Sequence, residues 1–282
     1  MRQSLSKRRC CYLLGISMLF AALSSPLSAH TYTGKPLHRP LLVDAGWLKE
    51  RLGTPGLIVI DARSPEEYMQ GHIAGALNIP SIETYHTTLG QRVASLTSIE
   101  RMLGTRGIHR SDHVVIYDCG VYRDAARLFW VLSLYGHINI AIVNGGYPAW
   151  RNAGLPLDTR VPVRVPVRYR AAIRPGLMAT RLQMLLAIDN PTVAIVDTRG
   201  TDEYQGFESE ASRAGHIPGA INIPAALNVE MRQGVQYFKS LPELQELYKN
   251  VAAYNKVILY CNNGCESSTS YLALRLLGKQ VS

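Results

Sequence analysis

The residue with the clearest potential for chemistry is Cys261, which follows the apolar run from Val257 to Tyr260. Helix-forming residues come next and end at Gly278, so we expect Cys261 at the carboxyl edge of a buried strand, facing a helix N-terminus. The N–H groups of a tight loop can converge as an anion-binding nest, and the helix dipole adds partial positive charge there. Such surroundings lower a thiol's pKa and make it a nucleophile. The alternative is a buried, inert cysteine at a strand end.

The elements that must position this cysteine belong to an internal repeat. LIVIDARSPEEYMQGHIAGALNIP, at residues 57–80, returns at residues 193–224, and the second copy carries eight extra residues between Tyr204 and His216. Further on, VVIYDCG at 114–120 matches VILYCNN at 257–263. A repeat this long exceeds solenoid periods and indicates two whole domains. We assign them to residues 40–155 and 177–282, joined by a linker at 156–176.

Each copy alternates apolar strand runs with helical patterns, which is typical of an α/β domain with a parallel sheet covered by helices on both faces. The segment between the copies, residues 154–176, alternates valine with arginine and contains four prolines. This composition favours an extended connector over a helix.

The repeated segments resemble the rhodanese family of sulfurtransferases. The resemblance rests on a tyrosine followed by Gly-His-Ile-x-Gly-Ala near a Val-Ile-Asp-x-Arg strand, and on NGGYPAW at 144–150, and it covers residues 40–282. It implies two tandem rhodanese-like domains, each a parallel sheet flanked by helices. It also implies sulfane-sulfur transfer from an anionic donor, thiosulfate or 3-mercaptopyruvate, to cyanide or a thiol, through a persulfide on Cys261. A sulfur-carrier or interaction module without turnover is the alternative.

The second copy is expected to be the catalytic one. In the first copy the position of Cys261 is taken by Asp118, which cannot carry a persulfide, and Cys119 is displaced by one residue. By resemblance, the first domain is a non-catalytic scaffold that walls one side of the site.

The resemblance also suggests substrate-binding residues. Arg199 stands where the family has an arginine two residues after the strand's aspartate, and Arg213 lies in the insertion; a salt bridge within the domain is the alternative for Arg199. Arginine can grip an anion with two parallel hydrogen bonds. The remaining predicted substrate-binding residues are those of the six-residue loop that Cys261 opens: Asn262, Asn263, Gly264, Cys265 and Glu266.

Several side chains near the loop have an open or structural role. Asn262 and Asn263 add no charge, so donor preference stays open, and Glu266 would raise the pKa of a nearby thiol. Cys265 is either a resolving thiol that forms a disulfide with Cys261 or a small buried hydrophobe. We expect His72 and His216 to hydrogen-bond the backbone. His86 is a candidate catalytic histidine by rough position only.

Residues 1–29 have the build of a secretory signal peptide, with basic residues, an apolar run from Tyr12 to Leu23, and small residues up to Ala29, where cleavage is expected. The apolar run is too short to span a bilayer. A mitochondrial presequence is the rival interpretation. The sequence thus predicts a periplasmic or secreted protein without stable membrane insertion once the signal is cleaved.

Composition limits the partners of the mature chain. The signal segment holds four of the 30 basic residues and none of the 21 acidic ones, which leaves a formal charge of +5. This mild charge suits small anions but gives no case for nucleic acid. No zinc spacing and no cofactor motif is present, so we expect neither a metal nor a cofactor.

The second copy is also short by comparison with the first. The first has strand 138–143 and Trp150 after Gly136, whereas only four residues follow Gly278. We therefore expect the second domain to lack its last strand and to be looser than the first, with low activity. The alternative is that Val281 with a partner's edge strand substitutes, or that the domain interface holds the sheet.

Overall fold

The computed structural model describes residues 40–89 and 92–282, so the predicted signal peptide lies outside the described residues. The first copy contains, in chain order, β1 (Leu42–Val43), α1 (Ala45–Lys49), β2 (Leu57–Asp61), α2 (Pro65–Gln70), β3 (His72–Ile73), β4 (Leu77–Asn78), η1 (Ser81–Thr84), α3 (Leu96–Thr105), β5 (His113–Tyr117), α4 (Arg123–Leu134), β6 (Ile140–Val143), α5 (Gly146–Asn152) and β7 (Leu157–Asp158).

The second copy follows with η2 (Pro175–Leu177), α6 (Arg181–Ala187), β8 (Val193–Asp197), α7 (Thr201–Gln205), β9 (Ile221–Asn222), η3 (Ala225–Asn228), β10 (Val229–Arg232), β11 (Val235–Phe238), α8 (Leu241–Leu247), η4 (Lys249–Val251), β12 (Lys256–Tyr260) and α9 (Cys265–Leu276).

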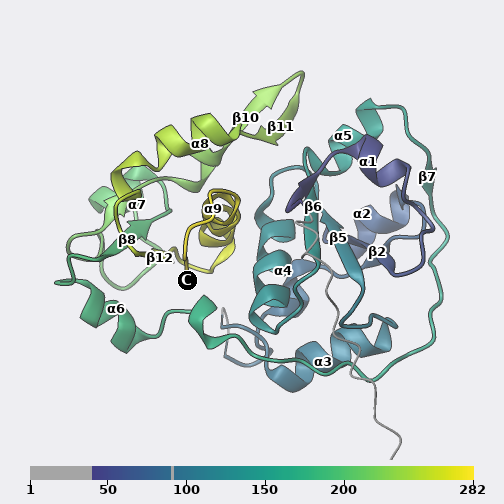
Figure 1. Ribbon diagram of the computed structural model, residues 1–282, viewed down its shortest axis with the longest axis horizontal. Coiled ribbons are helices and arrows are strands. Elements are labelled where there is room, and N and C mark those ends of the chain that lie inside the picture. The colour runs from purple at the N-terminus through teal and green to yellow at the C-terminus, as the bar shows by residue number, and fades with distance from the viewer. Residues whose placement is uncertain (1–39, 90–91) are drawn as a thin grey trace, which may run out of the picture. The chain divides into compact units, whose positions relative to one another are not determined.

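The first copy is a parallel sheet between two layers of helices (Figure 1). Among the described residues the strands of this sheet run in the order β1-β6-β5-β2-β4, and all of its pairings are parallel, while β3 and β7 form a separate antiparallel pair. Alternate side chains of β2 and β5 enter two separate cores: Ile60 and Ile116 pack with α3 and α4, while Val59 and Val115 pack with α1 and α5. Burial of both faces explains the solid apolar runs and confirms the α/β prediction.

The second copy repeats this plan with a parallel sheet in the order β12-β8-β9 within the described part of the chain. No strand element follows α9 there, yet residues 280–282 lie parallel to β12 where β6 pairs with β5 in the first copy. The Val257 N–H donates to the Gln280 carbonyl at 3.1 Å, and the Leu259 N–H donates to the Ser282 carbonyl at 2.9 Å. Val281 is 2% exposed and belongs to the core. The outer edge of β12 is therefore partly paired by residues 280–282, which agrees in part with the alternative that Val281 takes the place of the missing strand.

The connector between the copies has neither helix nor strand from residue 159 to 174, as its prolines predicted. It lies against the first copy, where the Val167 N–H donates to the Gly104 carbonyl at 2.8 Å and the Ala172 N–H donates to the Tyr135 carbonyl at 3.0 Å. A Cβ at Gly104 would come within 2.6 Å of the Val167 carbonyl oxygen, so this close approach requires glycine.

The two copies meet through equivalent helices. α4 and α9, each of which follows the loop after a central strand, pack side by side (Figure 1). Phe129 of α4 and Tyr271 of α9 lie with ring centroids 6.2 Å apart. One hydrophobic cluster includes buried side chains of both helices, so the copies share a continuous core.

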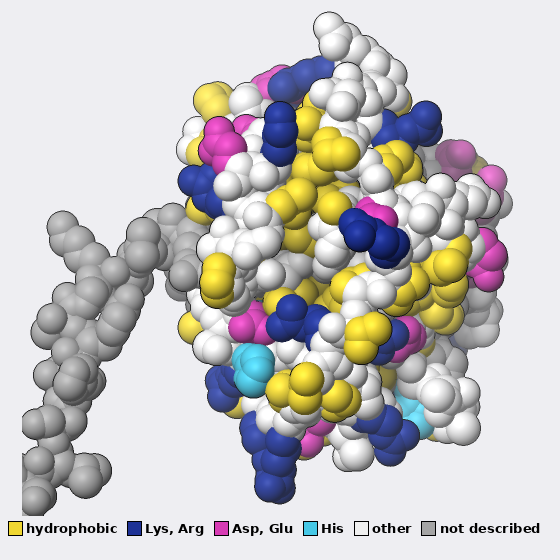
Figure 2. All heavy atoms as spheres, turned by 90° about the vertical axis from the view of Figure 1, so that its right-hand side faces the viewer, with side chains coloured by type: hydrophobic (Ala, Val, Ile, Leu, Met, Phe, Trp, Pro, Cys, Tyr) yellow, Lys and Arg dark blue, Asp and Glu magenta, His cyan; other side chains and the backbone are white. Residues whose placement is uncertain are grey.

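The surface is mixed in character. On the face shown in Figure 2, basic side chains lie among acidic and hydrophobic ones instead of forming one continuous patch. Within the described residues no helix combines the length and apolar character needed to cross a membrane.

Candidate active site

Cys261 lies immediately after β12 and four residues before the start of α9, as the sequence predicted. Its Sγ is half-buried, accepts a hydrogen bond from the Gly264 N–H at 3.0 Å, and lies 3.5 Å from the Ser267 Oγ. Gly264 has a φ of +87°, which lets the chain turn into the helix while its N–H points back at the sulfur. The sulfur thus lies at the mouth of a helix N-terminus, where negative charge is favoured.

Cys261 also lines a pocket of about 230 Å³. The described residues that line it carry hydroxyl, apolar and backbone groups but no charged side chain: Trp130, Leu177, Met178, Ala179, Met184, Leu259, Tyr260, Cys261, Gly264, Ser267, Ser268, Tyr271 and Ser282. An anion at this thiol is therefore met by N–H and O–H donors and not by a cation in the pocket wall.

The equivalent loop of the first copy holds the carboxylate of Asp118. This side chain accepts hydrogen bonds from the backbone N–H groups of Gly120 at 2.8 Å, Ala125 at 3.1 Å and Tyr122 at 3.3 Å. Burial raises the pKa of Asp118 to about 6 despite these donors. The neighbouring Cys119 is exposed, whereas Asp118 is buried, so their side chains point to different sides. The first copy fills its own anion site with a carboxylate.

Of the other loop residues, Asn262 and Glu266 point toward acidic or mixed surroundings. The Asn262 Nδ2 donates to Glu203 Oε1 at 2.7 Å. Glu266 lines a second pocket, of about 350 Å³, together with Arg123 of the first copy. Burial raises the pKa of Glu266, while Arg123 opposes that shift. Glu266 thus faces a pocket other than the one that Cys261 lines.

Cys265 is turned toward the first copy. It is buried, and its Sγ lies 3.0 Å from the hydroxyl of Tyr85. Burial raises the pKa of this thiol. No disulfide joins it to Cys261 or Cys119 within the described residues, where all three cysteines are free.

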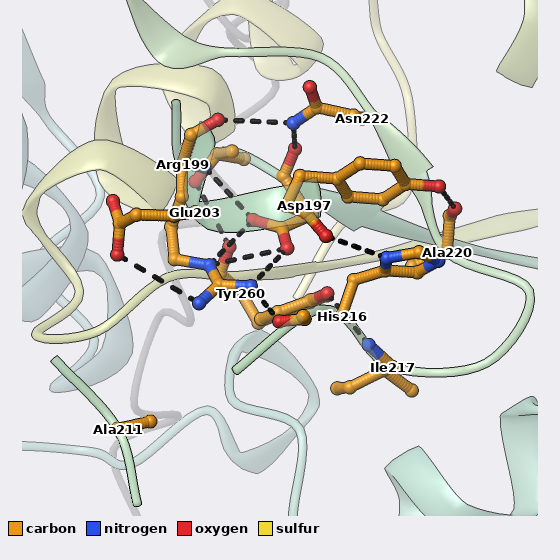
Figure 3. Close-up of polar contacts among 12 residues, drawn as sticks. Asp197, Arg199, Glu203, Ala211, His216, Ile217, Ala220, Asn222 and Tyr260 are labelled. Carbon is orange, nitrogen blue, oxygen red and sulfur yellow. Dashed lines mark hydrogen bonds and ion pairs between the residues drawn. The ribbon is translucent and has the colours of Figure 1, made fainter. Parts of the chain in front are cut away.

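Arg199 forms a buried ion pair inside the second copy (Figure 3). Its Nε and Nη2 donate to both carboxylate oxygens of Asp197, at 2.6 to 3.2 Å, and Nη2 also donates to the Gly215 carbonyl. Arg63 makes the same set of contacts with Asp61 in the first copy. The pair recurs in the first copy, where Asp118 takes the place of Cys261, so the contacts agree with the salt-bridge alternative for Arg199, and its role in substrate binding stays a prediction.

The histidines of the repeat are structural, as expected. The Nδ1 of His216 lies 2.8 Å from the Tyr204 carbonyl, and the two rings stack with their centroids 3.7 Å apart. His72 and Tyr68 repeat this arrangement at 2.9 and 3.8 Å. The repeated sequence signature therefore describes a folding unit.

Two further candidates form no hydrogen bond with the Cys261 thiol within the described residues. Arg213 is exposed, and within the described residues its guanidinium makes no hydrogen bond or ion pair. The Nδ1 of His86 accepts hydrogen bonds from the N–H groups of Thr88 and Leu89 in its own loop. The roles suggested for Arg213 and His86 by sequence position stay predictions.

The first-copy residues that do contact the Cys261 loop were not predicted from the sequence. The Nη1 of Arg127 donates to the Asn263 carbonyl at 3.0 Å, and Tyr85 contacts Cys265. A signal was present for the arginine, because Arg127 is the one charged residue in the otherwise apolar run at 125–132. Tyr85 is adjacent to the histidine that we had considered, and no local pattern marks it.

Known proteins share both the sequence and the architecture. The profile of the rhodanese-like domain matches residues 44–153 and 180–282. A thiosulfate sulfurtransferase of Pseudomonas aeruginosa is 30% identical over 244 residues, covering 85% of this chain and 89% of that protein. The SseA protein of Mycobacterium leprae is 34% identical over 266 residues, covering 86% and 84%.

The crystal structure of SseA from Escherichia coli, a 3-mercaptopyruvate sulfotransferase, superposes with a TM-score of 0.75 at 26% identity, over 86% of this chain and 97% of that chain. Because one profile match falls on each copy of the repeat and together they span most of the sequence, the protein belongs to the rhodanese-like family, as a tandem sulfurtransferase.

Proposed function

We propose that this protein transfers sulfane sulfur from an anionic donor, thiosulfate or 3-mercaptopyruvate, to cyanide or a thiol, with Cys261 as the carrier. The observation that supports this most is the Cys261 sulfur at a helix N-terminus, 3.0 Å from the Gly264 N–H, where the first copy has a carboxylate in the matching position. Thiosulfate and 3-mercaptopyruvate appear in the names of the relatives.

In the first step the Cys261 thiolate attacks the outer sulfur of thiosulfate. The S–S bond of the donor breaks, sulfite leaves with the bonding electron pair, and Cys261 holds a persulfide anion. With 3-mercaptopyruvate the C–S bond breaks instead, and the donor's thiol proton moves to the carbon to give pyruvate. In the second step cyanide attacks the outer persulfide sulfur, thiocyanate leaves, and the thiolate is restored.

The loop favours both anionic states of the sulfur. The Gly264 N–H and the dipole of α9 act on the thiolate and on the persulfide alike, and the Ser267 hydroxyl lies within reach of the same atom. Asn262 and Asn263 add no charge, and the pocket wall offers hydroxyls, which can bind a sulfonate or a carboxylate.

Thiocyanate formation from cyanide, run in parallel with thiosulfate and with 3-mercaptopyruvate, tests the activity. Intact-mass measurement after donor treatment should show one added sulfur that Cys261→Ser abolishes and Cys119→Ser retains. An adduct that persists in Cys261→Ser would refute the carrier role. An adduct without thiocyanate would favour the non-turnover sulfur carrier.

We also propose export to the periplasm or the medium, on the strength of residues 1–29. N-terminal sequencing of the protein from fractionated cells should begin at His30; a cytosolic protein that retains Met1 would refute it.

A further inference from the structure

Arg127 belongs to the first copy, and its side chain contacts the Cys261 loop of the second copy. It extends from the second turn of α4, and its Nε donates to the Thr84 Oγ1 at 3.1 Å while its Nη1 donates to the Asn263 carbonyl at 3.0 Å. The guanidinium also lies over the rings of Tyr85, at 4.2 Å, and Trp130, at 5.2 Å. These contacts fix the plane of the guanidinium against the loop.

The charge of this arginine is buried and lacks a carboxylate. Arg127 is 2% exposed, its Nη2 has no hydrogen-bond partner, and within the described residues it forms no ion pair. A guanidinium remains protonated in proteins even when burial lowers its pKa, as it does here. Burying an uncompensated charge is costly, so such a residue is a candidate for pairing with a negative group that forms in function.

The Cys261 sulfur, which becomes negative in the reaction, lies on the other side of Gly264. That residue's N–H points to the Cys261 sulfur, whereas a Cβ on it would lie 2.3 Å from the Arg127 Nη1. One residue therefore separates the guanidinium from the sulfur.

Building on the proposed function, we propose that Arg127 is a positioning residue that the non-catalytic domain supplies to the catalytic one. It holds the Cys261 loop by the Asn263 carbonyl, and its buried charge is the counter-charge for the thiolate and persulfide on Cys261. The position of α9 that matches Arg127 is Thr269, whose hydroxyl donates to a carbonyl of its own helix. The arginine of α4 therefore reaches the loop after β12, and α9 offers no matching cation to the loop after β5.

The other titratable or charged groups around the Cys261 loop come from several surrounding elements. They are Glu203 and the Asp197–Arg199 pair of the second copy, Tyr260 of β12, Cys265 and Glu266 of α9, Tyr85 of the η1 loop, and Arg123 and Asp124 of α4. The acids among these oppose a negative sulfur, and Arg127 is the buried cation in contact with the loop backbone.

The pH profile of Cys261 alkylation tests this counter-charge. The rate of Cys261 labelling by iodoacetamide is measured from pH 5 to 10 by peptide mass spectrometry. In Arg127→Gln the midpoint of this rate profile should move by about one pH unit to higher pH, which makes the reaction about tenfold slower on the acidic limb. Arg127→Lys keeps the charge and should restore most of the shift. Arg101→Gln, an exposed change on α3, is the matched control.

A folded Arg127→Gln protein whose profile coincides with the wild-type profile would overturn the proposal, as would equal shifts in the glutamine and lysine variants. If Arg127→Gln does not fold, the wild-type midpoint is compared in 0.05 and 0.5 M NaCl. A buried counter-charge leaves the midpoint in place, whereas a rise with salt assigns the effect to exposed charges and refutes the role of Arg127. Alkylation requires no sulfur transfer. The carrier role of Cys261 is tested separately, by whether Cys261→Ser still gains the sulfur adduct, so the two proposals can fail independently.

Discussion

At the scale of single residues, the position of Gly264 requires both a left-handed backbone and the absence of a Cβ, and only glycine meets both requirements. Its φ of +87° is a left-handed conformation, and the Arg127 Nη1 occupies the space where a Cβ would lie. Gly278 also has a positive φ, of +72°, but a Cβ there would meet nothing within 4 Å. A comparison of substitutions at the two glycines therefore distinguishes the effect of backbone strain from the effect of a clash with Arg127.

We predict that Gly264→Ala lowers kcat/KM by more than tenfold, because the arginine or the loop must move. Gly278→Ala should keep near-normal kcat/KM and lose only about 1 kcal/mol of stability from the left-handed strain. Steady-state rates and thermal denaturation of both variants check this. Equal activity losses in the two would show that the Arg127 contact is unimportant.

Asp118 gives the first copy a pH-dependent stability. Its pKa is raised from 3.8 to about 6, so between pH 4 and 6 the folded chain keeps a proton that the unfolded chain releases. The contribution of this carboxyl to the free energy of unfolding therefore falls as pH rises through that window, and is constant above it.

Replacing it by Asn removes the titration. The stability of Asp118→Asn relative to wild type should increase by roughly 2 kcal/mol from pH 4 to 7, an order-of-magnitude figure from the pKa difference. Urea denaturation of both proteins at several pH values measures it. A difference that is flat with pH would mean that Asp118 ionises normally.

Cys265 is expected to be slow to react, which argues against the resolving-thiol hypothesis. It is buried, its pKa is raised, and it lies against Tyr85. Under native conditions iodoacetamide should label Cys261 before Cys265, as peptide mass spectrometry would show. A Cys261–Cys265 disulfide that peroxide forms and dithiothreitol removes would revive the switch.

At the scale of secondary structure, apolar patterning predicted the central strands well. The runs at 57–60, 113–117 and 257–260 were recognisable because strands buried on both faces must be apolar. The β10–β11 hairpin went unnoticed because its residues are mostly half-exposed. The partners of the loop were missed for another reason: Arg127 and Asn263 are 136 residues apart in sequence, and only the packing of α4 on α9 brings them together.

The pairing of residues 280–282 with β12 can be tested by deletion. Removing these residues should speed hydrogen exchange at the Val257 and Leu259 amides, which donate to Gln280 and Ser282. The Ile258 and Tyr260 amides are the internal control, because alternate residues of a parallel strand bond to opposite neighbours, here β8. Uniformly fast exchange across β12 would instead mean that the second sheet as a whole had loosened.

At the scale of the whole molecule, the shared core changes our expectation of an independently loosened second domain. Buried side chains of α4 and α9 belong to one cluster, and Val281 adds to it. Domains joined by such a core unfold together when the interface is a large part of their stability.

We therefore predict one cooperative urea transition for the full chain. Intrinsic fluorescence reports the first copy, which contains Trp47, Trp130 and Trp150. The alkylation of Cys265, which is buried in the folded second copy, should give the same urea midpoint. Labelling of Cys265 at a clearly lower urea concentration than the fluorescence change would show that the second copy opens by itself.

The packing of α4 on α9 also has a consequence for the order of events during synthesis. The first copy precedes Cys261 by about a hundred residues, so it is the first to emerge, from the ribosome or from the membrane of an exporting cell, and domains generally fold as units. Arg127 can thus be in place on the folded first copy before the second copy has emerged, and the reactive loop takes its final form only when the last helix docks there. Until that moment the thiol lacks its proposed counter-charge, so we expect sulfur transfer to begin only when the whole chain has emerged and folded.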